Sequence, residues 1–325
     1  MDIRAKEVTS LSMGNAVMQS PLWALLKGQH HWQAHAFTID TGGQVSDLLV
    51  LTRPLAGRLR LAYIPHGPRA DHRMDLSHLA AGLASHLGGN VFALRIDLPP
   101  KSVNTLPSPP FIPCRSSIQP EATVRIDLSG GYEAVRTHYR SRAKRALKAN
   151  AAASLVIDQE CSFDDFYALY SETGKREGFL IRSKEYMQSV VEAGDGVHML
   201  CAHLDGKLVA ALVLLLTDYE ALYLYGASAR LEKISPSYSL QDRAIQIACE
   251  KGCAVYDLHG VGEAGTKSGH LASLELFKRS FGGERITRPT TADWPYRKGV
   301  WRLYRAAEWV RQRQVEIRRE KRRSP

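Results

Sequence analysis

The sequence lacks the segments that would carry it into or across a membrane. The N-terminal stretch MDIRAKEVTSLSMGNAV has no apolar core followed by small residues, so we expect no secretory signal. The longest strongly apolar run, from Leu208 to Leu216, is too short to span a bilayer. We therefore expect a cytoplasmic protein, with any contact at the inner face of the membrane being peripheral.

Cysteines are few, and their spacing matches no metal-binding or redox motif. The five cysteines are scattered along the chain without a Cys-x-x-Cys pair. Cys249 and Cys253 could share a helix face, but a zinc site needs two further ligands at suitable spacing, and the sequence offers none. We expect reduced thiols throughout and no metal.

What the sequence does have is positive charge, unevenly placed. The formal net charge is +10, and the segment from Arg297 to Pro325 holds eleven Lys or Arg against three Glu, a net charge of +8. A second cluster without acidic residues has helical spacing, which predicts a basic stripe on one helix; its members are Arg136, Arg140, Arg142, Lys144, Arg145 and Lys148. Such stripes attract the phosphates of RNA, nucleotide-linked sugars or anionic lipids. A merely solvated helix face is an equally good interpretation.

Hydrophobic periodicity predicts the same order of elements twice. In each half, a hairpin is followed by a third strand, a helix and a further strand that leads to an aspartate, Asp97 or Asp257. The first copy is predicted at 35–40, 47–53, 60–64, 74–86 and 91–97, and the second has strands at 198–204 and 207–216, a strand ending in YLYGAS, a helix at 237–250 and a strand leading to YDLHGV. We therefore predict a duplicated α/β (α+β) unit.

The length of 325 residues favours two domains. We place the boundary after the strand TVRIDL, which gives a first domain at 1–128 and a second, carrying the active centre, at 129–296. No strand is expected after Thr287. The segment 297–325 is predicted as one long basic helix that joins the first domain.

The repeated order is similar to the acetyltransferase (GNAT) superfamily fold, with mixed sheets flanked by helices. Coenzyme A donors require a glycine-containing loop whose backbone N–H groups bind pyrophosphate at a helix N-terminus. The corresponding connections, ARLEKISPSYSL and RADHRMDL, contain no glycine. An acyl donor other than acetyl-CoA is therefore favoured.

A family resemblance supplies such a donor. The motifs that carry it are QSPLWALLKGQHHW, YIPHGP, HYRSRAKRALKAN, FYALYSETGKREGF followed by IRSKEY, YLYGAS, YDLHGV and LELFKRSFGG. In this order and spacing they resemble, nearly end to end, the Fem family of peptidoglycan interpeptide-bridge transferases. The resemblance implies two tandem acetyltransferase-like units. Some members of the family carry a coiled-coil arm, but this sequence has no heptad stretch, so we expect the compact type without the arm. It also implies transfer of an amino acid from aminoacyl-tRNA to a muramyl-pentapeptide, linked to UDP or to a lipid, with charged tRNA as co-substrate and no other cofactor. We expect the protein to be a monomer.

The resemblance assigns roles to individual residues. Phe277 and Lys278 match the family's Phe-Lys pair at the charged end of the tRNA, where a cation would stabilise the tetrahedral intermediate. Without the resemblance, Lys278 would be interpreted as an exposed lysine on a helix packed through Leu276, Phe277 and Phe281.

Four further residues match positions that contact the precursor: Lys27, Arg182, Tyr186 and Tyr225. Arg182 and Tyr186 would share one face of a helix, and Tyr223 and Tyr225 would share one face of a strand, which leaves the choice between these two tyrosines open.

Two groups of residues keep alternative interpretations. Asp97 could bind the incoming amine or act as base, or it could be a turn aspartate before Pro99. For tRNA we select the middle of the basic stripe, namely Arg140, Arg142, Lys144 and Arg145. Three other functions stay open: acylation of an exopolysaccharide or another amine, non-catalytic binding of RNA or an anionic surface, and an acetyl-CoA enzyme. The transferred amino acid and the general base are not identified.

Overall fold

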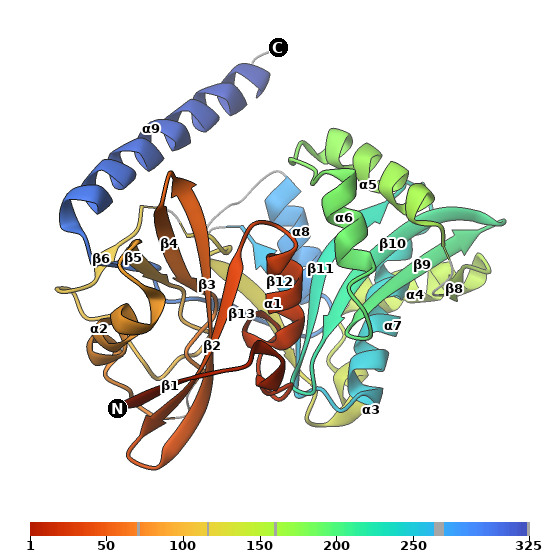
Figure 1. Cartoon of the computed structure of the whole chain (residues 1–325). Helices are drawn as coiled ribbons and strands as arrows, with labels where there is room; N and C mark the ends of the chain where they lie inside the picture. The colour runs from red at the N-terminus through yellow and green to blue at the C-terminus, as the bar shows by residue number, and fades with distance from the viewer. Residues whose placement is uncertain (70–71, 116, 159–160, 263–269, 324–325) are drawn as a thin grey trace. The chain divides into compact units, whose positions relative to one another are not determined.

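The chain divides into two compact units, and each is described by itself. The computed structural model describes residues 1–69, 72–115, 117–158, 161–262 and 270–323. Unit 1 comprises Met1–Val8, His31–Ile118 and Pro289–Pro325, and unit 2 comprises Thr9–His30 and Gln119–Arg288 (Figure 1). Each unit is therefore assembled from separated stretches of sequence.

Unit 1 is built on a seven-stranded sheet in the order β1-β2-β3-β4-β5-β14-β6. Among its described strands, only β4 and β5 pair in parallel, and α2 connects them. Its elements are β1 (Asp2–Lys6), β2 (Gln33–Thr41), β3 (Gln44–Ala56), β4 (Leu59–Ile64), α2 (Leu76–Leu87), β5 (Val91–Ile96), β6 (Ile112–Pro113), β14 (Ala292–Pro295) and α9 (Lys298–Arg323). The helix α2 begins at a capping aspartate, Asp75, and buries Leu76, Leu79 and Leu83 against this sheet.

Unit 2 repeats this plan with a sheet in the order β13-β7-β12-β11-β10-β9-β8. Here β11 and β12 are the parallel pair and α7 connects them. Its strands are β7 (Ala122–Asp127), β8 (Val156–Asp158), β9 (Val197–Leu204), β10 (Lys207–Leu216), β11 (Glu220–Ser228), β12 (Val255–Val261) and β13 (Glu284–Thr287). Its helices are α1 (Pro21–Gly28), α3 (Gly131–Thr137), α4 (Ser141–Ala152), α5 (Phe163–Glu177), α6 (Lys184–Val191), α7 (Pro236–Glu250) and α8 (His270–Arg279), with 3₁₀ turns η1 (Val8–Ser10) and η2 (Val17–Gln19).

The internal repeat predicted from the sequence is confirmed. The hairpins β2–β3 and β9–β10, the parallel pairs β4–β5 and β11–β12, and the connecting helices α2 and α7 occur in the same order. The two aspartates are also equivalent in chemistry: the hydroxyls of Tyr63 and Thr291 donate to Asp97, and the hydroxyl of Thr123 donates to Asp257. Both carboxylates are buried.

The structure divides the chain differently from the boundary placed after residue 128. The strand β7 pairs with β12 and β13 of unit 2, and the helix α1 also belongs to unit 2. Conversely, β14 follows Thr287, where no strand was expected, and pairs with β5 of unit 1. Each sheet thus contains one strand from the other predicted domain: β14 in unit 1 and β7 in unit 2. Strand patterns show that a segment is extended, but they do not show its partner.

One cysteine expectation is wrong. Cys161 and Cys201 form a disulfide, with their Cα atoms 6.2 Å apart. The two residues are forty positions apart, in the segment before α5 and in β9, so sequence spacing gave no indication that they meet. Cys114, Cys249 and Cys253 are free. Among the described helices, none is long and apolar enough to cross a membrane.

Candidate active site

Lys278 lies inside unit 2 and is not a surface lysine. Lys278 lies on α8 and is only 4% exposed, whereas Leu276, two residues earlier, is 54% exposed. Of the three apolar residues expected to pack, Phe277 and Phe281 face the core and Leu276 does not, and Lys278 is buried with them. Phe277 packs edge-on against Tyr238 at 4.8 Å between ring centroids, which holds α8 on the core.

The Lys278 ammonium group is held by backbone carbonyls. It donates to the carbonyl oxygen of Gly260 at 2.6 Å and to that of His259 at 3.3 Å. These carbonyls are available because β12 departs from regular pairing with β7 between Asp257 and Gly260, and His259 has a positive φ of 59°. The Asp257 carboxylate accepts from the His259 backbone N–H at 2.7 Å and so fixes this irregular turn.

Burial changes the acid–base behaviour of this region. Desolvation lowers the pKa of Lys278 from 10.5 to about 7, although the Asp257 carboxylate opposes the shift. Desolvation likewise lowers the pKa of His259 to about 4, and the positive charges of Lys278 and Arg288 act in the same direction. The site therefore contains a neutral imidazole beside an amine that changes charge near neutral pH, which is the kind of perturbation found at functional sites.

A second group of side chains in unit 2 forms a positively charged cluster around one ring. The Lys27 Nζ lies 5.8 Å from the centroid of the Tyr186 ring, and the Arg182 guanidinium carbon lies 5.4 Å from it. Burial and the charge of Arg182 lower the pKa of Lys27 to about 8. Within the described part of the chain, neither cation makes an ion pair with a carboxylate. Two like charges held together in this way favour an anionic ligand.

Tyr225 and His30 complete this cluster. The Tyr225 hydroxyl lies 3.4 Å from the Tyr186 hydroxyl, and burial raises the pKa of the Tyr225 phenol. The His30 ring packs against Tyr186 at a tilt of 34°, with 4.3 Å between the ring centroids, and its Nε2 lies 2.8 Å from the Ser189 hydroxyl. His30 is a site residue that the sequence did not indicate, although it lies only three residues after Lys27. The structure thus brings together Lys27, Arg182, Tyr186 and Tyr225.

The expectation that Arg182 and Tyr186 lie four apart on one helix is wrong. Ser183 is the N-cap of α6 and its side chain accepts from the Tyr186 backbone N–H, so Arg182 precedes the helix. The guanidinium nevertheless reaches the Tyr186 ring from this position.

Tyr223 and Tyr225 do not share a face of β11, which is a second correction. Tyr223 pairs with Leu214 of β10, whereas Tyr225 pairs with Val213, the neighbouring residue, because the ladder shifts by one residue. Adjacent strand residues point to opposite faces. Leu214 and Tyr223 belong to the core on the side of α7, and the Tyr223 ring lies 5.6 Å from the Lys278 Nζ. Tyr225 therefore points to the other face, where Tyr186 lies.

The two groups flank a point where the sheet opens. The strands β11 and β12 pair over only three positions, from Glu220–Val255 to Leu222–Asp257. Beyond these pairs lie Tyr223 and Tyr225 on β11 and the irregular turn at His259 on β12. The Lys278 group thus lies on one face of the open strands, and the cationic cluster lies on the other.

Asp97 differs from the other candidates. It belongs to unit 1, whereas Lys27, Arg182, Tyr186, Tyr225 and Lys278 belong to unit 2. Its buried carboxylate accepts hydrogen bonds from two hydroxyl groups, and its backbone bridges to Ile64 and Gly67. These contacts give Asp97 a structural role at the end of β5 and leave no support for a role as base or amine ligand.

The basic stripe occupies two helices, not one. The helix α3 ends at Thr137 and α4 begins at Ser141, so the segment that carries His138 and Arg140 breaks the predicted single helix. Arg142, Lys144, Arg145 and Lys148 of α4 are exposed, as is Arg140 at its N-cap. Within the described residues none of these five pairs with a carboxylate. They form an exposed basic surface on unit 2.

The connection before α7 is closed to a pyrophosphate. The Asn150 side chain accepts from the Ser235 backbone N–H at 3.0 Å and donates to the Ser235 carbonyl and the Ser239 hydroxyl. Pro236 at the first position of α7 has no N–H to offer. The protein's own side chain therefore occupies the donor that a coenzyme A phosphate would use. Among the described residues, no cluster of three or more His, Cys, Asp or Glu could hold a metal ion, and metal-independence stays a prediction.

Comparison with known proteins supports an acetyltransferase-like fold. Residues 133–268 match the acetyltransferase (GNAT) domain family. The fold class predicted from the sequence, two tandem acetyltransferase-like units, is confirmed.

Individual relatives are more specific. Over 302 residues the chain is 24% identical to the UDP-N-acetylmuramoylpentapeptide-lysine N(6)-alanyltransferase of Weissella viridescens, with 86% of this chain and 88% of that protein covered. The crystal structure of FemX superposes with a TM-score of 0.76 at 16% identity, covering 94% of this chain and all of that one. The C-terminal domain of a putative lysylphosphatidylglycerol synthetase from Agrobacterium fabrum is similar with a TM-score of 0.52 at 14% identity, over 89% and 92% of the two chains. The resemblance to the Fem family that the motifs predict is confirmed.

Proposed function

We propose that this chain is an aminoacyltransferase that moves an amino acid from aminoacyl-tRNA to an amine on the stem peptide of a muramyl-pentapeptide precursor, in interpeptide-bridge formation. The alanyltransferase of Weissella viridescens, a relative over most of the chain, is named for a UDP-linked muramyl-pentapeptide and its lysine. The geometry of unit 2 supports this proposal, because it offers one group of residues for an anionic precursor and another for an ester donor.

One observation carries the proposal: two differently equipped groups flank the open strands β11 and β12. On one face, Lys27 and Arg182 form a cationic cluster around Tyr186, which suits the diphosphate of a UDP-linked or lipid-linked precursor. On the other face, Lys278 sits next to Tyr223 in a desolvated setting. The precursor's peptide would extend from the cluster between the strands toward Lys278.

The chemistry is aminolysis of an ester. The precursor amine attacks the aminoacyl carbonyl, an N–C bond forms, the C–O bond to the tRNA ribose breaks, and the released ribose hydroxyl takes up the proton lost by the amine. Negative charge develops on the carbonyl oxygen in the intermediate. The Lys278 ammonium, which donates to the Gly260 and His259 carbonyls, would stabilise that charge in a water-poor site, where a cation has the greatest effect.

The tRNA body would bind the exposed cations of α4, with Arg140, Arg142, Lys144 and Arg145 contacting phosphates. Aminoacyl-tRNA then serves as co-substrate, and the reaction needs no other cofactor. The filled pyrophosphate position at Asn150 and Ser235 argues against acetyl-CoA as the donor.

The test is to offer the purified chain labelled total aminoacyl-tRNA together with UDP-linked or lipid-linked muramyl-pentapeptide, followed by mass analysis of the product. We expect one amino acid added to the amine of the stem peptide. Labelling of another amine-bearing polymer, with the pentapeptide left unmodified, would assign a different acceptor. Retention of tRNA without any transfer would make the chain a binding protein, and acetylation from acetyl-CoA would reject the proposed donor.

A further inference from the structure

The C-terminal helix α9 is fixed to unit 1 through one face. Arg95 of β5 makes ion pairs with Asp293 of β14 at 2.7 Å and with Glu308 of α9 at 2.9 Å. The Trp301 indole donates to Asp293 at 2.9 Å, and Tyr304 packs against Phe92. These contacts lie within the first three turns of α9. They set the orientation of the helix about its own axis.

The face of α9 turned away from the sheet is apolar. Leu303, Val310 and Ile317 recur every seven residues, and they are 75%, 47% and 44% exposed. Trp309 beside them is 43% exposed. Residues at this spacing lie along one side of a helix, and a large exposed apolar stripe of this kind marks an interaction surface. Arginines flank the stripe, among them Arg302, Arg311 and Arg313.

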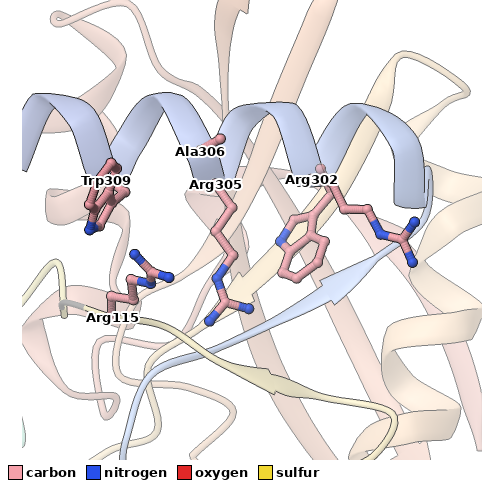
Figure 2. Close-up of a pocket in the computed structure, with 6 residues that line it drawn as sticks. Arg115, Arg302, Arg305, Ala306 and Trp309 are labelled. Carbon is pink, nitrogen blue, oxygen red and sulfur yellow. The ribbon is translucent and has the colours of Figure 1, made fainter.

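A cavity of about 550 Å³ lies along the same helix. It is lined by Arg115, Trp301, Arg302, Arg305, Ala306 and Trp309 (Figure 2). Two of the arginines contact the indole rings. The guanidinium carbon of Arg305 lies 5.2 Å from the centroid of the Trp301 ring, and that of Arg115 lies 5.9 Å from the centroid of the Trp309 ring. Within the described residues, none of the three arginines of the cavity pairs with a carboxylate. Three cations with aromatic walls suit a phosphate on an amphipathic molecule.

We infer that α9 is a docking element for an anionic membrane surface, with lipid phosphates in the arginine cavity and the stripe of Leu303, Val310 and Ile317 in the interface. RNA and an anionic membrane both present phosphates, and the exposed aliphatic side chains of α9 favour the membrane. RNA would use the arginines but would leave Leu303 and Val310 in water, whereas a lipid interface removes both from water. The net charge of +8 between Arg297 and Pro325 complements an anionic leaflet. This inference does not depend on the transfer reaction.

The experiment is co-sedimentation of the full chain with vesicles of phosphatidylcholine alone or mixed with phosphatidylglycerol. We expect binding to the mixed vesicles only. A double variant Leu303→Gln with Val310→Gln and a double variant Arg302→Gln with Arg305→Gln should each lower the partition constant about tenfold. The control is Val45→Gln, since Val45 is an apolar residue of unit 1 near the turn of the β2–β3 hairpin, and its exposure lies between those of Val310 and Leu303.

Three results would overturn the inference. The first is equal vesicle binding by the wild type and both double variants. The second is loss of binding to total tRNA, without loss of vesicle binding, in the arginine variant, which would make the cavity an RNA site. The third is conversion of a dimer to a monomer by the Leu303 and Val310 substitutions, measured by analytical ultracentrifugation, with vesicle binding intact. Transfer to the UDP-linked precursor without vesicles should be the same in all variants, which separates this test from that of the proposed function.

Discussion

Tyr223 and Tyr225 stand two residues apart on β11, yet they contact opposite faces of the second sheet. Tyr223 lies against Lys278, and Tyr225 lies against Tyr186. The one-residue shift in the β10–β11 ladder produces this arrangement. Gly226 permits it, because a side chain at this position would overlap the Tyr223 hydroxyl. A single irregularity thus gives one strand a contact with each half of the proposed site.

Titration of Lys278 should stop the transfer rate from rising above about pH 7. Below pH 7 the lysine is protonated, and the rate rises with pH as more of the precursor amine, with an ordinary pKa of about 10.4, becomes neutral. Above about 7, the buried Lys278 loses its proton and its stabilising charge. These opposing effects cancel, so the rate measured at saturating substrates should level off above pH 7.

Lys278→Arg provides the comparison, because a guanidinium stays charged across this range. In that variant, whatever its absolute rate, the increase should continue beyond pH 8. A wild-type rate that keeps rising tenfold per pH unit from 7 to 9 would show that the charge on Lys278 is not required.

The cationic cluster should bind the precursor before tRNA arrives. Lys27→Met should weaken binding of UDP-muramyl-pentapeptide by about tenfold, measured by calorimetry without tRNA, because one of two phosphate-facing charges is lost. In the wild type, affinity should decline as pH rises through about 8, since the proton on Lys27 is lost there. Lys184→Met is the control, because Lys184 is exposed and paired with Asp164. Equal losses in both variants would contradict the assignment.

The exposed cations of α4 should govern the salt dependence of tRNA binding. With Arg142→Ala and Lys144→Ala combined, log affinity should fall less steeply with log salt, by about one unit of slope for each phosphate contact removed. Filter binding of charged tRNA over a salt series measures this slope. Lys207→Ala, on the exposed β9–β10 turn, should leave it unchanged. An unaltered slope in the double variant would move the tRNA elsewhere.

The buried charges that anchor α9 should matter for stability. Arg95→Met leaves Asp293 and Glu308 without their cation, so the free energy of unfolding in urea should fall by about 3–5 kcal/mol. Replacing all three by Met should restore much of this loss, because no unpaired charge then remains buried. A triple variant no more stable than Arg95→Met would show that the ion pairs themselves are indispensable.

Local pattern predicted much of this fold. The hairpin around Asp205 and Gly206, the helix now seen as α7 and the long helix α9 follow from turn chemistry and periodicity, which act between neighbours in sequence. The pairing partners of β7 and β14 could not be predicted in this way. The strand β7 joins the sheet of unit 2, and β14 joins the sheet of unit 1. Which strands pair depends on the path of the whole chain.

The candidate site was less predictable than the fold. The approach of Lys27 to Arg182 came from the family resemblance, because more than 150 residues separate them in the sequence. The burial of Lys278 contradicts the amphipathic pattern of its helix, and it depends on the irregular turn at His259. The only local sign of the one-residue shift in the β10–β11 ladder is Gly226, three residues after Tyr223.

The central claim is that Lys278 acts on the transfer step and not on binding. The most direct measurement is single-turnover transfer by wild type and Lys278→Met, with the affinities for charged tRNA and for precursor measured on the same preparations. The account predicts a loss of roughly a hundredfold or more in the transfer rate, with both affinities within a few-fold of wild type. A transfer rate within a few-fold of wild type, with both substrates bound normally, would contradict it.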